Sequence, residues 1–505
     1  MTPFYYLDNF HRAVGSLQSR YADLLSAEEQ SFIRSVQSVP QESAGLLVRM
    51  RMRRGDLFRT SRLTYAEIGS TDEAIPPLAQ RGWVTVDPAL TLQELCQVLN
   101  RRELCTALSL KRMPRAFRTE RAHQQLRLPF TDEERRPAST WWRGSADRVL
   151  QVSVSRLCTR LRLLFFGNFR QDWTSFVLVD LGMQRFESVP FSPSSRPFQR
   201  REEIDQFHTL YDLAQRMSEG ESPEVILKAV PPPLGHGWLE QRRSKLLFMI
   251  ARQLERAGRL PEALAAYESS SHPDARLREI RVREREGRKR TLRRTSASWE
   301  TFELTLRPTP SPRGVEHVVK QALDTPESPV VYVENALINS LFGLHCWEAI
   351  FAPVPGAFFH PFQEAPADLL EPQFRARRAA EFERCFARID GGVHAATIVR
   401  TFRAKAGIQC PFVAWRLLTP KLLRLALMCI PPAHLKLMFE RLLADLRSNR
   451  TGMPDLIQFF PGERRYRMIE VKGPGDRLQD NQIRWLQFCV SHQLPASVCR
   501  LTWRS

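Results

Sequence analysis

Two short strand patterns near the C-terminus place the strongest constraint on this chain. Asp455 precedes the pattern Leu456–Phe460, a Pro-Gly turn follows, and Tyr466–Val471 reads as a returning strand. Antiparallel pairing would bring Asp455 close to the end of the second strand. Side chains alternate between the two faces of a strand, so Glu470 and Lys472 are expected on one face, beside Asp455.

The residue types at this edge suit one kind of chemistry. Two carboxylates can hold a divalent ion through oxygen, and a lysine beside them can orient or polarise an attacking water. The same spacing also occurs by chance in long chains, so the flanking residues matter. Pro454 precedes the first acid, Gly473-Pro474-Gly475 follows the lysine, and residues 481–488 then have helical spacing, with apolar residues at 483, 486 and 490.

The order strand, turn, strand, loop, helix, with Pro454-Asp455 and Glu470-Val471-Lys472, resembles the PD-(D/E)XK nucleases. The run from Glu470 to Leu478 and the following Trp485-Leu486 resemble the VRR-NUC branch of that superfamily. The resemblance implies an α/β nuclease domain, and we assign residues 311–505 to it.

A further acid is expected upstream, because enzymes of this superfamily often take a metal ligand from a helix ahead of the core. The run from Val330 to Leu337 leads into the apolar stretch Ile338–Leu344, and Glu334 is placed to start an apolar helix. Glu334 is therefore the candidate. The alternative is a helix cap or dipole partner, which is the commoner role of an acid in a first helical turn.

The chain has a formal net charge of +19 over 505 residues. A polyanionic partner is expected, nucleic acid first and an anionic membrane surface second, although a composition bias of the genome would give the same excess. The nine cysteines include no C-x-x-C pair, which favours reduced thiols over a zinc or disulfide framework. The N-terminus lacks a signal-peptide pattern, and no stretch is long and apolar enough to span a membrane.

Composition and periodicity predict a multidomain, mostly α protein. Residues 1–88 have helical patterns that end in a strand at Trp83–Pro88 and contain an arginine cluster, which favours a winged-helix-like DNA-binding region; a solvated basic helix face explains the cluster equally well. Residues 89–220 begin with two short helical patterns, at 92–99 and 102–108, that resemble a SAP-type DNA-binding element. A helical hairpin that serves only packing is the alternative.

Residues 221–310 contain a helix pair at 245–267 that resembles one tetratricopeptide unit. An arginine-rich helix at 276–294 follows, and it is expected to face DNA phosphates or solvent. The Ser-, Thr- and Pro-rich stretch 296–328 reads as a linker.

Ordered blocks along the chain resemble the Fanconi-associated nuclease family. They are the run from Glu334 to Gln363, which includes Trp347-Glu348 and Val354-Pro355-Gly356, the run Phe166–Trp173, and the helix pair around Gln253–Gly258. They follow one another in order over nearly the whole chain, so the sequence is similar to a bacterial member.

The resemblance implies cleavage of branched DNA that depends on Mg²⁺ or Mn²⁺ in a two-ion site. The implied activities are 5′-flap endonuclease and 5′→3′ exonuclease action in DNA repair, including interstrand-crosslink repair. By position, the metal ligands would be Glu334, Asp455, Glu470 and the Val471 carbonyl, and the catalytic residues Asp455, Glu470 and Lys472. Gln363 would support the active site.

The resemblance also implies a basic pocket for a 5′ phosphate, with Arg242, Arg243, Lys245 and Arg252 as candidates. The family's zinc-finger ubiquitin-binding module has no counterpart here, because the sequence has no cysteine–histidine cluster. His345 stands where the family pattern has an aromatic residue, and we interpret it as a packing histidine.

The expected partner is branched double-stranded DNA with a 5′ flap or 5′ end, bound by a monomer or a DNA-dependent dimer. A cytoplasmic, nucleoid-associated bacterial protein is expected. Two alternatives stay open. A four-way-junction resolvase of the VRR-NUC type would use the same acids in a symmetric dimer, although the long helical N-terminal part favours a flap enzyme. A non-catalytic DNA-binding helical-repeat scaffold would have lost the site, yet Glu334, Asp455, Glu470 and Lys472 are all present.

Overall fold

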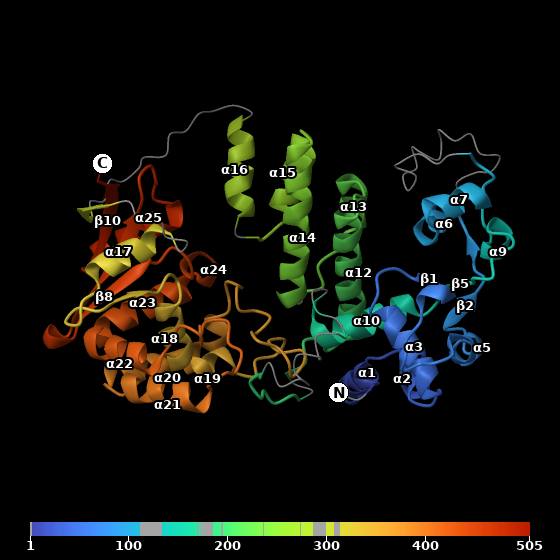
Figure 1. Cartoon of the computed structure of the whole chain (residues 1–505), viewed down its shortest axis with the longest axis horizontal. Helices are drawn as coiled ribbons and strands as arrows, with labels where there is room; N and C mark the ends of the chain where they lie inside the picture. Colours follow the sequence, from blue (N-terminus) through green and yellow to red (C-terminus); the bar gives the residue numbers. More distant parts are fainter. Residues whose placement is uncertain are drawn as a thin grey trace. The chain divides into compact units, whose positions relative to one another are not determined.

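A computed structural model of the chain describes residues 3–111, 134–168, 171, 173, 185–192, 195–235, 237–272, 274–285, 299–307 and 314–504. The chain forms two compact units: Met1–Met183 with Phe198–Glu219, and Gln184–Pro197 with Gly220–Ser505 (Figure 1). The four domain ranges expected from sequence stay predictions. Parts of the block Phe166–Trp173 and of the basic helix 276–294 lie outside the described residues.

The first unit joins a set of helices to a small antiparallel sheet of order β1-β5-β2. As predicted, helical patterns end in a short strand, which spans Val84–Val86. Its elements are α1 Tyr5–Tyr21, α2 Ala27–Val36, α3 Gln41–Arg51, β1 Leu57–Arg59, η1 Thr60–Arg62, α4 Thr71–Ala74, α5 Pro76–Gln80, β2 Val84–Val86, β3 Ala89–Leu90, α6 Leu92–Val98, α7 Arg101–Ala107, β4 Arg136–Pro137, α9 Ala138–Trp141, β5 Val149–Val152, α10 Ser155–Phe166 and α12 Arg201–Ser218.

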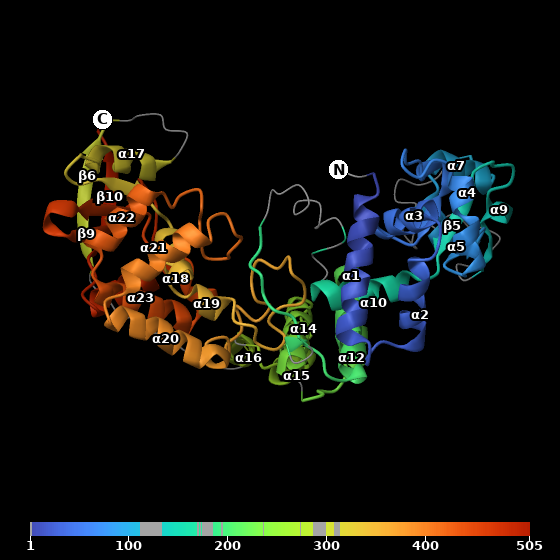
Figure 2. The ribbon, with the colours of Figure 1, turned by 90° about the horizontal axis from the view of Figure 1, so that it is seen from below.

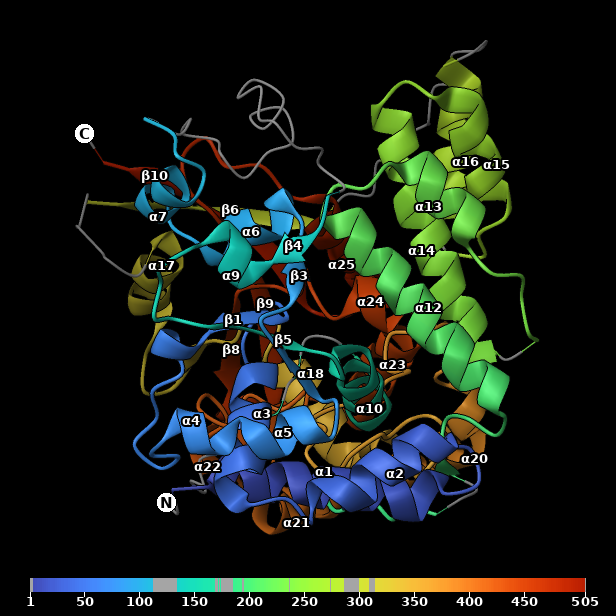
Figure 3. The same cartoon turned by 90° about the vertical axis from the view of Figure 1, so that its right-hand side faces the viewer.

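The two short helices predicted after residue 89 are confirmed as α6 and α7. Each begins with a capping box, in which Thr91 and Asn100 accept hydrogen bonds from the backbone three residues on. Both pack with α9 and the β3–β4 ladder around Leu95, Leu104 and Trp141 (Figure 3). The pair therefore has a hydrophobic core, and its expected role in DNA binding stays a prediction.

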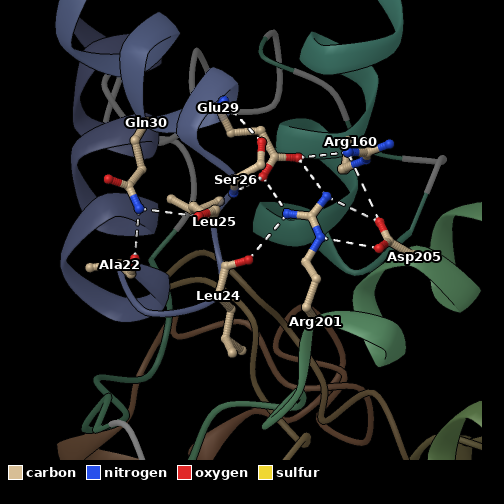
Figure 4. Close-up of polar contacts among 9 residues, drawn as sticks. All are labelled: Ala22, Leu24, Leu25, Ser26, Glu29, Gln30, Arg160, Arg201 and Asp205. Carbon is tan, nitrogen blue, oxygen red and sulfur yellow. Dashed lines mark hydrogen bonds and ion pairs between the residues drawn. The ribbon is translucent and has the colours of Figure 1, made fainter.

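A buried glutamate connects three helices of the first unit. Glu29 of α2 is 1% exposed and forms ion pairs with Arg160 of α10 at 2.8 Å and Arg201 of α12 at 2.5 Å, while Arg201 also holds Asp205 (Figure 4). Burial raises the pKa of Glu29, but the hydrogen bonds from Arg201, Ser26 and Arg160 outweigh it and hold the pKa below its ordinary value. These arginines therefore serve the fold.

The arginine cluster of residues 49–62 is divided between structure and surface. Arg49 pairs with Glu67, Arg51 with Asp56, and Arg59 with both Glu103 and Asp147. The exposed members are Arg53, Arg54 and Arg62. Neither simple interpretation of the cluster holds in full, because half of its six guanidinium groups have acid partners inside the unit.

The second unit starts with packed helices and continues into a mixed α/β domain. The predicted helix pair is confirmed as α14 and α15, and α16 packs beside α15 (Figure 1). Its elements are α13 Pro223–Ala229, α14 Gly237–Arg256, α15 Leu260–Glu268, α16 Ala275–Arg285, β6 Glu300–Leu306, α17 Val315–Leu323, β7 Val330–Tyr332, α18 Leu337–His345, α19 Trp347–Ile350, η4 Ala376–Arg378, α20 Ala379–Asp390, α21 His394–Ala404, α22 Pro420–Cys429, α23 Pro432–Ala444, α24 Leu446–Asn449, β8 Leu456–Phe460, η5 Pro461–Glu463, β9 Arg465–Lys472, α25 Asp480–Ser491 and β10 Ala496–Trp503.

The α/β domain is built on a five-stranded sheet of order β6-β10-β9-β8-β7. β7, β8 and β9 pair antiparallel, whereas β10 runs parallel to β9 and to β6. One face packs on α17 through a small cluster that includes Ile469 and Val471, and the other packs on helices around α18 and α23 through a large core (Figure 2). Strand β8, between β7 and β9, is apolar almost throughout because both faces are covered.

The linker predicted at 296–328 is wrong where the structure describes it. Glu300–Leu306 is the edge strand β6, paired with β10 along seven registered positions, and Val315–Leu323 is helix α17. Phe302, Leu304 and Leu306 alternate toward the small core cluster. The Ser, Thr and Pro composition concealed this strand because its partner lies almost 200 residues away.

The last predicted helix is confirmed as α25, with a shifted apolar face. Trp485, Leu486 and Cys489 are buried, whereas Val490, expected on that face, is 42% exposed. Among the described residues no single helix has the length and apolar composition to span a membrane, and only α22 with α23, bent by 106°, pass that test as a pair.

Candidate active site

Three strand ends meet at one edge of the sheet and gather the predicted acids. Asp455 directly precedes β8, and Leu456 pairs with Ile469 of β9, so Asp455 lies beside Glu470. The Asp455 carbonyl accepts hydrogen bonds from the backbone N–H groups of Val333, at 2.8 Å, and Glu334, at 3.2 Å. These two bonds bring the segment after β7 to the same edge.

Asp455 is positioned by a backbone donor of the neighbouring strand. Its Oδ2 accepts the Val471 N–H at 2.8 Å, and the side chain is 7% exposed. Burial raises the pKa of Asp455 to about 6, with Glu316 and Glu334 adding to the rise, while the Val471 hydrogen bond and Lys472 oppose it.

Glu470 and Lys472 lie on one face of β9, as predicted. The Lys472 Nζ is 2.8 Å from Glu470 Oε1, and the glutamate is only 1% exposed. Burial raises the pKa of Glu470 to about 7, and repulsion from Asp455 and Glu334 contributes, although Lys472 favours the charged form. Two neighbouring buried carboxyl groups with raised pKa values are a feature of functional sites.

Glu334 lies in the turn between β7 and α18, before the helix that we expected it to start. Its side chain is exposed and accepts a hydrogen bond from the Tyr332 hydroxyl. The next residue, Asn335, has φ +52° and accepts the Met453 N–H through Oδ1 at 3.0 Å. Asn335 thus ties the Glu334 turn to the segment that leads into Asp455.

The approach to Asp455 also requires Gly452. This residue has φ +89°, and a Cβ added to it would stand 2.7 Å from the backbone of Asn481 at the start of α25. Only glycine fits such a backbone at this distance. The close approach of α25 therefore fixes the path of residues 452–455.

Sequence reasoning missed a fourth acid, Glu316 in the first turn of α17. It raises the pKa of both Asp455 and Tyr332 through its charge. α17 lies in the stretch that the sequence predicts to be a linker, where no helix is expected. A Pro-free, apolar-periodic run from Val315 to Leu323 could have revealed the helix.

The donor set fits a hard divalent cation, because carboxylate oxygens are its preferred ligands. In the described ranges no three His, Cys, Asp or Glu side chains already stand in metal-holding geometry. Lys472 pairs with one oxygen of Glu470, and Tyr332 donates to one oxygen of Glu334, so an ion would share these carboxylates with the two groups or displace them.

Two other expected residues have structural contacts. Gln363 accepts the Phe359 N–H and donates to the carbonyls of Ala357 and Ala365, so its amide fastens its own loop. None of these partners belongs to the acid cluster. Among the described residues, no hydrogen bond of Gln363 supports the predicted role at the active site. His345 is 1% exposed, its Nε2 lies 2.8 Å from the Cys385 carbonyl, and burial lowers its pKa to about 4, as a packing histidine requires.

A basic cluster forms between α14 and α24 in the second unit. Arg447 of α24 donates to His272 Nε2 at 3.2 Å, and Arg242, Arg447 and Lys245 all act on the carboxyl of Glu371. Burial raises the pKa of Glu371 despite these three cations. Two of the four predicted phosphate-pocket candidates are thus brought together, with His272 and Arg447 as additions that the sequence did not indicate.

The other two candidates have different surroundings. Arg243 donates to the Pro231 carbonyl at 2.8 Å and pairs with Glu240 at 3.1 Å. Arg252 lies over the Phe248 ring at 6.0 Å. Arg243 therefore fastens the entry to α14.

Comparisons with known proteins place these features in a family. The sequence matches the family models described as "FAN1, HTH domain" over residues 4–85 and "VRR-NUC domain" over residues 391–503. It is 45% identical to a Fanconi-associated nuclease 1 homolog of Pseudomonas aeruginosa, with 99% of this chain and 96% of the relative covered. A homolog from Arabidopsis thaliana is 24% identical, with 98% of this chain and 66% of the relative covered.

Solved structures of a related protein have the same fold as this chain. The structure of paFAN1 bound to DNA with a 2-nucleotide 5′ flap and a gap matches with a TM-score of 0.88 at 44% identity, covering 100% of this chain and 99% of that one. The same protein bound to a 1-nucleotide 5′ flap matches with a TM-score of 0.87. The helix-turn-helix match supports the DNA-binding interpretation of the N-terminal region.

Proposed function

The chain belongs to the Fanconi-associated nuclease family, and from that premise we propose that it cuts branched DNA beside a 5′ flap and degrades DNA from a 5′ end in the 5′→3′ direction. The observation that carries the proposal is the meeting of Asp455, Glu470 and Lys472 at one sheet edge, with Glu334 tied to the same edge by the Asp455 carbonyl. Nucleases with the VRR-NUC domain depend on metal ions. The proposed setting is the repair of damaged DNA, including interstrand crosslinks, in the cytoplasm.

We assign the cation site to Glu334, Asp455, Glu470 and the Val471 carbonyl, with Mg²⁺ or Mn²⁺ as the ions. Bound there, the ions would lower the pKa of an attacking water and neutralise charge on the phosphate. The protein's own part is to bury Asp455 and Glu470, to hold the exposed Glu334 at the same edge, and to keep Lys472 beside Glu470. Lys472 supplies a charged N–H donor that orients the nucleophile or stabilises charge on a phosphate oxygen.

The basic cluster of Arg242, Lys245, His272 and Arg447 is our candidate for the site that accepts the 5′ phosphate. Arginine and lysine suit phosphate, and a helix-packed position fixes their geometry. The carboxyl of Glu371 interacts electrostatically with Arg242, Arg447 and Lys245. A phosphate that enters the cluster would compete with this carboxylate for the cations.

Recognition of the duplex arms is assigned to the exposed basic residues of the N-terminal unit. Contacts to phosphates position a protein on DNA without reading its sequence. Selectivity for a branch then follows from DNA shape, because a nicked or gapped junction bends more easily than a continuous duplex.

The test is cleavage of a labelled 5′-flap duplex with Mn²⁺ by the natural protein and by Asp455→Ala. Loss of cleavage with retained binding supports the proposal, and equal cutting by the variant refutes the site. Arg447→Gln should lower the rate on a 5′-phosphorylated flap more than on a 5′-hydroxyl flap. Equal losses on the two flaps would contradict the phosphate assignment.

A parallel assay on four-way junctions separates the flap enzyme from a junction resolvase. Preferred and symmetric cutting of the four-way junction would favour the resolvase. Binding of every branched substrate with no cleavage in Mg²⁺ or Mn²⁺ would favour a non-catalytic scaffold.

A further inference from the structure

A basic cleft lies at the end of the sheet opposite the catalytic residues. Its volume is about 390 Å³, and it is lined by Arg464, Arg465, Tyr466 and Arg467 at the start of β9, by His434 in the first turn of α23, and by Glu300 at the start of β6. Pockets for small molecules have volumes of roughly 300–1,000 Å³. The cleft is therefore large enough for one nucleotide.

Two of the three arginines in the cleft carry charge that no acid neutralises in the described part of the chain. Arg465 pairs with Glu463 at 2.5 Å and lies over the Phe460 ring. Arg464 and Arg467 have no ion-pair partner among the described residues. Against these two charges the cleft has one carboxylate, Glu300.

The guanidinium of Arg467 is fixed in place, yet one of its donors has no partner among the described residues. Its Nη2 donates to Gln458 Oε1 at 3.2 Å, and the guanidinium lies 4.8 Å from the Phe302 ring centre, so the group is held in place. Its Nε is buried and has no hydrogen-bond partner among the described residues. Buried donors nearly always have a partner, so this guanidinium keeps hydrogen-bonding capacity that the described residues do not use.

From this geometry we propose that the cleft binds the phosphate of a nucleotide. Guanidinium groups are the preferred protein donors to phosphate, and the fixed group of Arg467 together with the exposed group of Arg464 can bind it from two sides. Pro431 and Pro495 complete the wall with apolar surface against which a sugar or base can pack.

The phosphate has two sources with the same chemistry. One is a free nucleoside monophosphate, which is a product of exonuclease action. The other is the DNA backbone. Along β9 the distance from Arg465 to Glu470 is about 17 Å at roughly 3.3 Å per residue. One strand of duplex DNA covers that distance in about five nucleotides.

The test measures binding in EDTA, so that no substrate is cut. The background is Arg447→Gln, which removes the other proposed phosphate contact, and the probes are 5′-dAMP, followed by calorimetry, and a fluorescent 5′-flap duplex. Arg464→Asn is the main variant. Arg464 has φ +51°, which asparagine tolerates, and its side chain is exposed, so the fold is retained. Arg464→Lys keeps the charge, and Arg403→Gln removes an exposed arginine from α21 as the matched control.

We expect Arg464→Asn to weaken binding of at least one probe about tenfold, with Arg464→Lys and Arg403→Gln within about twofold of the background protein. Weaker binding of dAMP alone identifies the free nucleotide as the source. Weaker binding of the flap duplex identifies a backbone phosphate, and the dependence of the logarithm of affinity on the logarithm of salt concentration should then be shallower by about one. Equal affinities of Arg464→Asn and Arg403→Gln for both probes would overturn the proposal, whatever the cleavage assays show.

Discussion

Replacing Glu470 by glutamine should stabilise the metal-free protein at alkaline pH. The folded protein holds this carboxyl 1% exposed beside Asp455, and its pKa rises from 4.5 to about 7. Each tenfold change in proton affinity is worth about 1.4 kcal/mol, so the rise corresponds to about 3 kcal/mol.

The direction of the stability change with pH follows from proton linkage. The folded state binds the Glu470 proton more tightly than the unfolded state does. This contribution to stability is fully present below about pH 4.5 and is lost as the pH rises through about 7. Glutamine resembles the protonated acid at every pH. Glu470→Gln should therefore raise the free energy of unfolding by up to about 3 kcal/mol at pH 8 and by less than about 1 kcal/mol at pH 4.5.

The assay is urea unfolding followed by tryptophan fluorescence, in EDTA, at both pH values. Glu348→Gln is the matched control, because Glu348 is 65% exposed and pairs with Arg388 at the surface. It should change stability by no more than about 0.5 kcal/mol. The reasoning would be refuted if Glu470→Gln raised the free energy of unfolding equally at both pH values, or did not raise it at pH 8.

Three further predictions concern the same edge. Affinity for Mn²⁺ should rise at least about tenfold from pH 6 to pH 8, because Asp455 and Glu470 have raised pKa values and must lose their protons to bind an ion. An affinity that calorimetry finds independent of pH would contradict this. Gly452→Ala should cost about 1–3 kcal/mol in urea unfolding, because its Cβ meets Asn481, whereas an alanine at position 462, where nothing lies within 4 Å, should be close to neutral. Asn335→Ala should slow flap cleavage and lower stability by about 1–3 kcal/mol, since the Met453 N–H loses its acceptor; Asn335→Gly should recover part of the stability, because glycine accepts φ +52°, and equal stability of the two variants would contradict this.

Local patterns allowed much of the nuclease core to be predicted. β8 was placed at its observed bounds, and β9 within one residue at each end, because β-branched and aromatic residues, a Pro-Gly turn and alternation act over a few neighbours. The same alternation placed Glu470 and Lys472 on one face. The ion pair between them at 2.8 Å bears out that inference.

Residues whose role depends on distant partners were harder to find. β6 carries a local strand pattern, the alternation of Phe302, Leu304 and Leu306, but the Ser-, Thr- and Pro-rich residues around it favour a linker, and its partner β10 lies at the other end of the domain. His272 and Arg447 meet across 175 residues, and neither is part of a local motif. Gln363 lies in a family-like block, yet its amide bonds within its own loop.

The sequence by itself determined which chemistry is possible here, because the acids and the lysine are attached to strands whose pairing follows from short-range propensity and face alternation. Tertiary structure decided the properties of those groups. Burial between two packed faces moves the pKa values of Asp455 and Glu470 toward neutrality, and Glu316 adds its charge from a helix that no pattern linked to the site. Packing also gathered basic residues at two places away from the acids, since only the folded chain brings α14 to α24, or the start of β9 to α23.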